Sequence, residues 1–297
     1  MHTLAHFSDP HLTSLDDVGA RALFDRRALL NKRLFGYLSW LKRRRRVHRR
    51  EVLDVVVADM ASHAPDQILL SGDLTHVGMP AECDVAARWL KSLATPAGLR
   101  LVPGNHDRYV AADWHATLGL WSDYLEPAGA PRWPRLWQGD EVCVIGLDCA
   151  VPSGLFMATG TLGDAQIERL ATMLKATTQK FRVLMLHHSP LPDGHAWRKR
   201  LTDASALMRV IREFGAELIV HGHGHGEHFS VLPWRNGNCS VVAAPSASHA
   251  HDGRAGWNLF RIDKQGARWA VSLEMRRRVD GRMQSTASHQ WLTSANA

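Results

Sequence analysis

Five short clusters of carboxylate, histidine and amide side chains each follow an apolar run in this chain of 297 residues. The clusters are DPH at 9–11, GD at 72–73, GNHD at 104–107, HH at 187–188 and GHGH at 222–225. A short apolar run bounded by turn signals predicts a buried strand. Ligands of parallel sheets gather at the carboxyl ends of the strands, so this arrangement predicts one shared site at a sheet edge.

The first hundred residues alternate between strand-like and helix-like apolar spacing. Strands are predicted at 3–8, 67–71 and 99–103, and helices over about 20–41, 51–64 and 81–94. This alternation predicts a βαβαβ unit with a parallel sheet. Asp9, Asp73 and Asn105 each lie just past the end of one of these strands.

The rest of the chain adds further elements. Strands are predicted at 141–148, at 181–186 and before GHGH, helices at 163–178 and 203–214, and a Trp- and Pro-rich covering segment with short helices over 108–140. From residue 227 onward, strands and tight turns predict a second, mostly antiparallel sheet packed on the first. We therefore expect an α/β fold, a four-layer α/β/β/α sandwich of two packed mixed sheets flanked by helices. Its catalytic domain spans 1–277, with a basic helical insertion at about 20–50 and a loose tail at 278–297.

The side chains of the five clusters suit divalent metals. Carboxylate, imidazole and amide oxygen are ligands of manganese, iron and zinc. Residues two apart in an extended segment point to one side, so Asp9 and His11 can reach one ion, as can His223 and His225. The four cysteines lack CxxC spacing and are predicted to be buried, reduced thiols.

The ordered set D-x-H, GD, GNHD, H and GHxH resembles the calcineurin-like metallophosphoesterase superfamily, and is most similar to its bacterial cyclic-nucleotide and glycerophosphodiester phosphodiesterases. The motifs span residues 5–225. The resemblance implies two divalent ions, one held by Asp9, His11 and His225, the other by Asn105, His187 and His223, with Asp73 bridging them. It also implies that a bridging hydroxide attacks phosphorus and that His106 stabilises or protonates the leaving group.

Three further residues beside these motifs are candidates for substrate contact. Asp107 and Arg108 follow His106 directly, and either contact substrate or form salt bridges within the loop. His188 points away from His187 on an extended segment and is expected around the ligands or at the substrate. Other histidines, His48 among them, are interpreted as ordinary surface or core residues.

The net charge of +7 is concentrated in the segment KRRRRVHRR at 42–50, and without its seven cations the chain has equal numbers of basic and acidic residues. One interpretation is a packed helix with a solvated basic end. A second is contact with an anionic membrane surface through residues 32–50, since aromatic and arginine side chains suit lipid headgroups. Nucleic acid is a less favoured partner.

Three functions follow as hypotheses. The first is hydrolysis of a small soluble phosphodiester, either a cyclic nucleotide or a glycerophosphodiester. The second is a peripheral membrane pyrophosphatase of a lipid-linked substrate such as UDP-diacylglucosamine. The third is a non-catalytic metal-binding scaffold, and a nuclease is a lesser enzymatic alternative. No secretory signal or spanning segment is recognisable, so we expect a cytoplasmic protein, with the inner face of the membrane as an alternative location.

Overall fold

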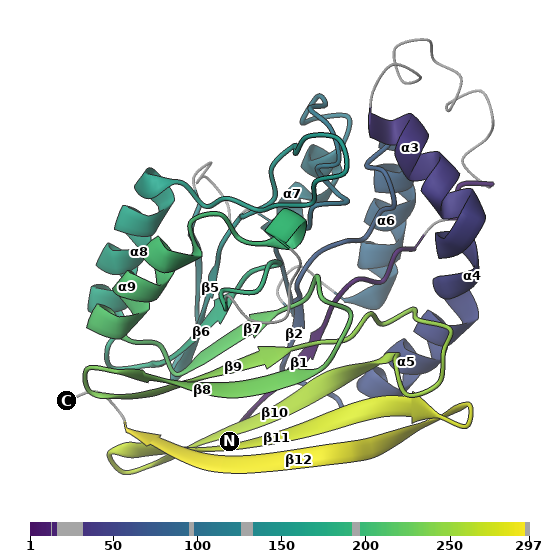
Figure 1. Ribbon diagram of the computed structural model, residues 1–297. Helices are drawn as coiled ribbons and strands as arrows, with labels where there is room; N and C mark the ends of the chain where they lie inside the picture. Colours follow the sequence, from purple (N-terminus) through teal and green to yellow (C-terminus); the bar gives the residue numbers. More distant parts are fainter. Residues whose placement is uncertain (13, 17–31, 95–97, 126–132, 192–196, 295–297) are drawn as a thin grey trace.

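Two six-stranded sheets packed face to face form the centre of the molecule (Figure 1). The computed structural model describes residues 1–12, 14–16, 32–94, 98–125, 133–191 and 197–294. The strand orders are β12-β11-β10-β1-β2-β3 and β4-β5-β6-β7-β9-β8. One apolar cluster fills the space between the sheets, and two others lie under the helices on their outer faces. The predicted four-layer α/β/β/α sandwich is confirmed.

The first sheet contains the predicted βαβαβ strands. These are β1 (His2–Phe7), β2 (Gln67–Leu70) and β3 (Leu99–Leu101), which pair in parallel, with helices α5 (Arg50–Ser62) and α6 (Pro80–Leu93) on the outer face. Helix α6 starts with a proline, whose fixed φ suits the first helical position. The buried Glu82 carboxylate accepts hydrogen bonds from the backbone N–H groups of His76, Val77 and Met79, which fixes the loop between β2 and α6.

The second sheet is built from the middle of the chain. Its first strands are β4 (Arg135–Gln138), β5 (Val142–Gly146), β6 (Phe181–Met185) and β7 (Leu218–His221), covered by α8 (Asp164–Ala176) and α9 (Ala204–Phe214). Strands β5, β6 and β7 are parallel, so their carboxyl ends share one edge. The predicted covering segment contains η2 (Leu118–Trp121) and α7 (Ser122–Leu125), and its residues 126–132 lie outside the described residues. A short helix, η3 (Trp197–Lys199), precedes α9.

The C-terminal strands correct one expectation, because they do not form a sheet of their own. The hairpin of β8 (His228–Trp234) and β9 (Gly237–Ala243) extends the second sheet, with β9 parallel to β7. Strands β10 (Gly256–Gln265) and β11 (Arg268–Val279) extend the first sheet, with β10 antiparallel to β1. Each group therefore pairs with an edge that the parallel strands leave open, and both sheets become mixed.

The loose tail predicted at 278–297 is a second correction. Residues Arg282–Ser294 form strand β12, paired with β11 along its whole length. Ala287 and Trp291 pack against the cluster between the sheets, whereas Met283, on the other side of a register shift, packs on the opposite face against the cluster under the helices. The polar residues between them suggested a tail, whereas an antiparallel strand with one face in water has this alternating composition. Residues 295–297 lie outside the described part of the chain.

The basic insertion is helical where the structure describes it. It contains α3 (Lys32–Ser39), the π-helical segment η1 (Trp40–Arg44) and α4 (Arg45–Val47), which rise beside α6 in Figure 1. Gly36 allows close packing, because a Cβ there would lie 2.7 Å from Val77 Cγ1. The predicted helix over 20–41 is described from Lys32 onward, and its earlier part lies outside the described residues. No described helix is long and apolar enough to cross a bilayer.

Candidate active site

All five predicted clusters converge at the carboxyl ends of β1, β2, β3, β6 and β7. Two groups of side chains have potential metal-ligating atoms within 4.8 Å of one another, namely Asp9, His11 and His225, and Asp73, His187 and His223. Asn105 Oδ1 lies 3.2 Å from His187 Nε2 and so joins the second group. The structure thus gathers the seven residues predicted as ligands.

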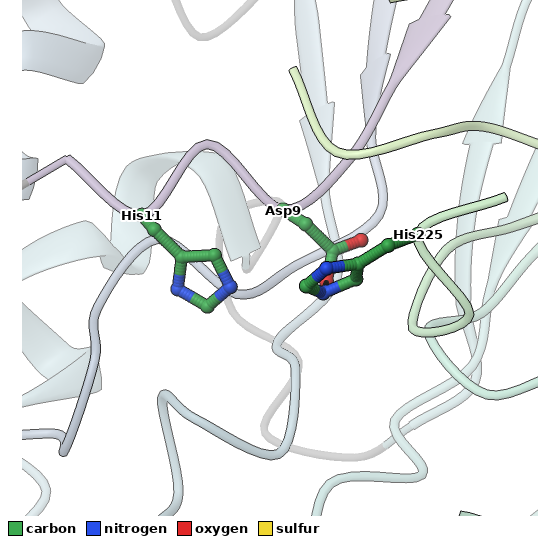
Figure 2. A group of neighbouring side chains, drawn as sticks. All are labelled: Asp9, His11 and His225. Carbon is green, nitrogen blue, oxygen red and sulfur yellow. Dashed lines mark ion pairs between the residues drawn. The ribbon is translucent and has the colours of Figure 1, made fainter. Parts of the chain in front are cut away.

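The first group combines the N-terminal loop with the last histidine motif. Figure 2 shows Asp9, His11 and His225 facing one another. His225 Nε2 lies 3.1 Å from Asp9 Oδ1. The other Asp9 oxygen accepts a hydrogen bond of 3.1 Å from the backbone N–H of His223, so this carboxylate also fixes the chain that carries the second group.

Asp73 is the central carboxylate of the second group. Its Oδ2 lies 3.3 Å from His187 Nε2, and its Oδ1 accepts a hydrogen bond of 2.7 Å from the backbone N–H of His106. Gly104 is required beside it, because a Cβ at this position would lie 2.1 Å from Asp73 Oδ1. The segments that follow β2 and β3 therefore lie closer together than any side chain at position 104 would allow.

Backbone strain is concentrated at the same residues. Eight described non-glycine residues have positive φ, and five of them are Asp9, His11, Asp73, His223 and His225. Such conformations cost free energy, and in folded proteins they cluster at functional sites. The chain is therefore bent to aim these side chains inward.

Two of the histidines are oriented as metal ligands usually are. His11 Nδ1 lies 2.8 Å from the Thr75 carbonyl oxygen, and His187 Nδ1 lies 2.6 Å from that of Ser71. Because a carbonyl oxygen only accepts, Nδ1 must carry the proton in both rings, which leaves Nε2 as the nitrogen that binds a metal once it is unprotonated. This arrangement fits a divalent cation.

The electrostatics of the site also suit a cation. Burial raises the pKa of Asp9, but the neighbouring His225 outweighs it and holds this pKa well below its usual value. Burial would lower the pKa of His187, yet the Asp73 and Asp9 carboxylates raise it to about 9. Burial holds the pKa values of His11 and His223 well below 6.5, so both rings are neutral and can act as ligands.

His106 lies beside the second group, next to a cation that sequence reasoning missed. Its Nδ1 lies 2.5 Å from the His76 carbonyl oxygen and 3.1 Å from a guanidinium nitrogen of Arg44. Burial, followed by the charge of Arg44, lowers the pKa of His106 well below 6.5. Within a run of arginines, no local signal singles out Arg44, because its position depends on how α3 and η1 pack.

His48 was also missed as a neighbour of the site. Its ring centroid lies 4.2 Å from that of His11, and its Nδ1 lies 2.9 Å from Ser248 Oγ. Ser246 donates a hydrogen bond of 2.8 Å to the Asp9 backbone carbonyl. These residues surround the first group of ligands and hold its loop in place.

The three predicted substrate contacts have different environments. The Asp107 carboxylate is buried and accepts hydrogen bonds from the backbone N–H groups of Asp73, Leu74, Thr75 and Gly104, so it holds the two loops together. The nitrogens of His188 lie near the Ala158 carbonyl and Cys149 Sγ. Both environments favour a structural role over the predicted substrate contact. Arg108 forms an ion pair of 2.8 Å with Asp148. A contact between Arg108 and the substrate stays a prediction.

Comparison with known proteins agrees with this site. The family model described as calcineurin-like phosphoesterase matches residues 2–227. The chain therefore belongs to the calcineurin-like phosphoesterase family, as the motifs predicted, and is a metal-dependent phosphoric ester hydrolase. Its two groups of side chains are candidate metal-binding sites.

Curated relatives and solved structures extend the comparison. A glycerophosphodiester phosphodiesterase, GpdQ, of Enterobacter lignolyticus is 24% identical over 83% of this chain and 77% of its own length. The Escherichia coli cyclic AMP phosphodiesterase CpdA is 29% identical over 76% of this chain and 80% of its own length. A dimetal phosphatase from Danio rerio shares the fold, with a TM-score of 0.59, 12% identity, and coverage of 100% of this chain and 99% of that one.

Proposed function

We propose that this protein is a phosphodiesterase with a dinuclear metal centre, in which Asp73 is shared by two ions. The closeness of the two ligand groups supports this most directly, because the carboxylates of Asp73 and Asp9, one from each group, both raise the pKa of His187. Two divalent ions held by these residues would lower the pKa of a bound water and offset charge on the phosphoryl oxygens.

The protein's own residues would then orient the substrate and handle the proton. We place the phosphoryl group beside Asn105 and His106, within reach of the Arg44 guanidinium. The negative charge of the bound diester raises the pKa of His106, which burial and Arg44 lower in the free protein. His106 can then bind a proton and donate it to the departing oxygen.

The relatives guide the choice of reacting group. GpdQ is named for glycerophosphodiesters and CpdA for cyclic AMP. We therefore propose that the reacting group of the substrate is a phosphodiester of one of these two kinds. The lipid-linked pyrophosphate remains the alternative. Manganese, iron and zinc all suit the donor set.

The proposal is tested by measuring hydrolysis of bis(p-nitrophenyl) phosphate with manganese, before and after a chelator. Turnover that the chelator abolishes supports the hydrolase, and a well-folded, metal-loaded protein without turnover would favour the scaffold hypothesis. A panel of cyclic AMP, glycerophosphodiesters, UDP-diacylglucosamine and single-stranded DNA then identifies the substrate class.

We also propose that residues 32–50 contact an anionic membrane surface. Phe35 and Leu38 are exposed on α3 next to Lys42 and Arg43 on η1, a combination that suits anionic headgroups. Co-sedimentation with anionic liposomes, for the wild type and for a variant with the cations of 42–50 neutralised, provides the test. Equal sedimentation of the two proteins would reject the contact.

A further inference from the structure

A cavity of about 600 Å³ opens directly beside Asn105 and His106. One side is formed by α3 and η1, and the other by the loop at 155–158 together with residues 198–199. The cavity therefore joins the catalytic histidine to the basic insertion.

The charge of this cavity has one sign. Its cations are Lys32, Lys42, Arg43, Arg44, Arg198 and Lys199, and among the described lining residues none is acidic. Arg44 is nearest the reaction, because its guanidinium lies 3.1 Å from His106 Nδ1. Such a lining favours an anionic ligand group at the inner end of the cavity.

The same cavity carries an unusual share of exposed apolar surface. Among the described residues ten large apolar side chains are exposed, and four of them, Phe35, Leu38, Leu155 and Phe156, line this cavity. Phe35 and Phe156 come from opposite sides, with ring centroids 5.7 Å apart. Exposed apolar side chains gathered at one place mark a binding surface rather than ordinary scatter.

The two sides are fixed to each other by polar contacts. Lys32 Nζ donates hydrogen bonds of 2.8 Å to Ser153 Oγ and 2.7 Å to the Met157 carbonyl oxygen. The same ammonium lies 4.5 Å from the centroid of the Tyr109 ring. The apolar rim is therefore held in place across the cavity.

From these contacts we infer that the cavity binds the acyl chain of an amphiphilic phosphodiester. The phosphate lies beside Asn105, His106 and Arg44, and the chain packs over the touching rings of Phe35 and Phe156. Leu38, Leu155 and Met157 present aliphatic surface, which suits an alkyl chain better than a stacked nucleobase.

The reaction part of this inference rests on the proposed function, whereas the binding part does not. Water adds across one P–O bond, so that a phosphomonoester and an alcohol are released and the proton of the water ends on the alcohol. The acyl ester itself stays intact. Of the two kinds of diester in the proposed function, this inference selects the glycerophosphodiesters, and among them those that carry an acyl chain.

Binding is tested without turnover, using n-alkyl phosphates from butyl to decyl below their micellar concentrations. With manganese-loaded protein, calorimetry should show the dissociation constant falling about fourfold for each added methylene until the rim is covered. The double variant Phe35→Ser with Phe156→Ser should flatten this dependence. Val231→Ser, an exposed apolar side chain on β8, is the matched control and should keep the wild-type slope.

Equal affinity for all chain lengths in the wild type would overturn the inference, and so would equal slopes in the double variant and the wild type. Circular dichroism verifies that the double variant is folded, and Leu38→Ser provides a second substitution at the same rim. Both phenylalanines are exposed, so their replacement removes little core packing.

Turnover separates this inference from the proposed function. Glycerophosphoethanolamine is compared with its 1-hexanoyl and 1-octanoyl derivatives, and kcat/KM should increase with chain length. Hydrolysis of the short diester with no gain from the chain rejects the acyl site and keeps the phosphodiesterase. Chain-dependent binding of alkyl phosphates without hydrolysis of any diester keeps the acyl site and rejects the phosphodiesterase.

Discussion

The two regions around the site are built on different principles. The ligand loops (residues 9–11, 72–73, 104–106, 187 and 222–225) follow strand ends, and their side chains are mostly buried. The cationic wall (residues 32–47) lies beside them, where Gly36 and Trp40 pack around Val77 and Tyr109. It carries exposed Phe35, Leu38, Lys42 and Arg43 into the cavity. We propose that the ligand loops fix where phosphorus reacts and that the cationic wall selects the rest of the substrate.

This difference suggests that substitutions can change substrate preference without removing hydrolysis. The ligand loops are constrained by strained backbone and buried hydrogen bonds, so a small change there removes the reaction. The cationic wall uses long, exposed side chains, so changes there should alter affinity and chain preference first. The run at 42–50 is also divided, because Lys42, Arg43 and Arg44 line the cavity beside His106 whereas Arg45, Arg49 and Arg50 line a second one beside His11 and His48.

The largest effect is expected in the ligand loops. Asp73→Asn keeps the size of the side chain but removes the charge that we propose two metal ions share, so kcat for bis(p-nitrophenyl) phosphate should fall by about a thousandfold. Steady-state kinetics and metal analysis measure the effect. Asp84→Asn, an exposed carboxylate paired with Arg88, is the control. Near-normal turnover by Asp73→Asn would refute the central role of this residue.

His106→Ala should have the next largest effect. We expect kcat to fall by about a hundredfold, the size of a lost general acid, while the metal content stays close to that of the wild type. The loss should be greatest for diesters with poor leaving groups, which a series of aryl and alkyl phosphodiesters measures. If the variant loses its metal instead, His106 is a ligand and the proposed proton donation is wrong.

Arg44→Ala tests the point where the cationic wall meets the ligand loops. Loss of one charge-assisted contact of about 2 kcal/mol corresponds to about a thirtyfold fall in kcat/KM. Arg44→Lys should recover part of the activity. The matched control is Arg46→Ala, because Arg46 is an exposed cation of the same run. Equal effects of Arg44→Ala and Arg46→Ala would show that only the overall charge matters.

The smallest effect on turnover is expected from Gly36→Ala. The added Cβ would meet Val77 Cγ1 at 2.7 Å and the Tyr109 ring at 2.9 Å, so the cationic wall must shift. The free energy of unfolding should fall by about 1–3 kcal/mol, while kcat/KM for a short diester changes less than in Arg44→Ala. Denaturant unfolding measures this against Gly237→Ala, where the new Cβ would meet nothing nearer than 3.5 Å. If Gly36→Ala left the free energy of unfolding unchanged, the cationic wall would pack only loosely against Val77 and Tyr109.

The motifs made the seven candidate ligands and their convergence predictable. Asp9, Asp73 and Asn105 follow short apolar strands, and His223 and His225 flank a glycine, so local pattern alone placed them at strand ends. The parallel unit of β1, β2 and β3 was predictable for the same reason. Asp107 was harder to assign, because the backbone groups that occupy its carboxylate come from a loop more than thirty residues away.

By itself the sequence determined which residues are candidate ligands, since strand ends, spacing and ligand type are local properties. Only the tertiary structure decided which sheet each C-terminal hairpin joins, that residues Arg282–Ser294 form a strand, and that Arg44 lies against His106. Those outcomes depend on which edges and apolar surfaces are left open after the rest of the chain has packed. A run of like charges contains no local information about which of its members turns inward.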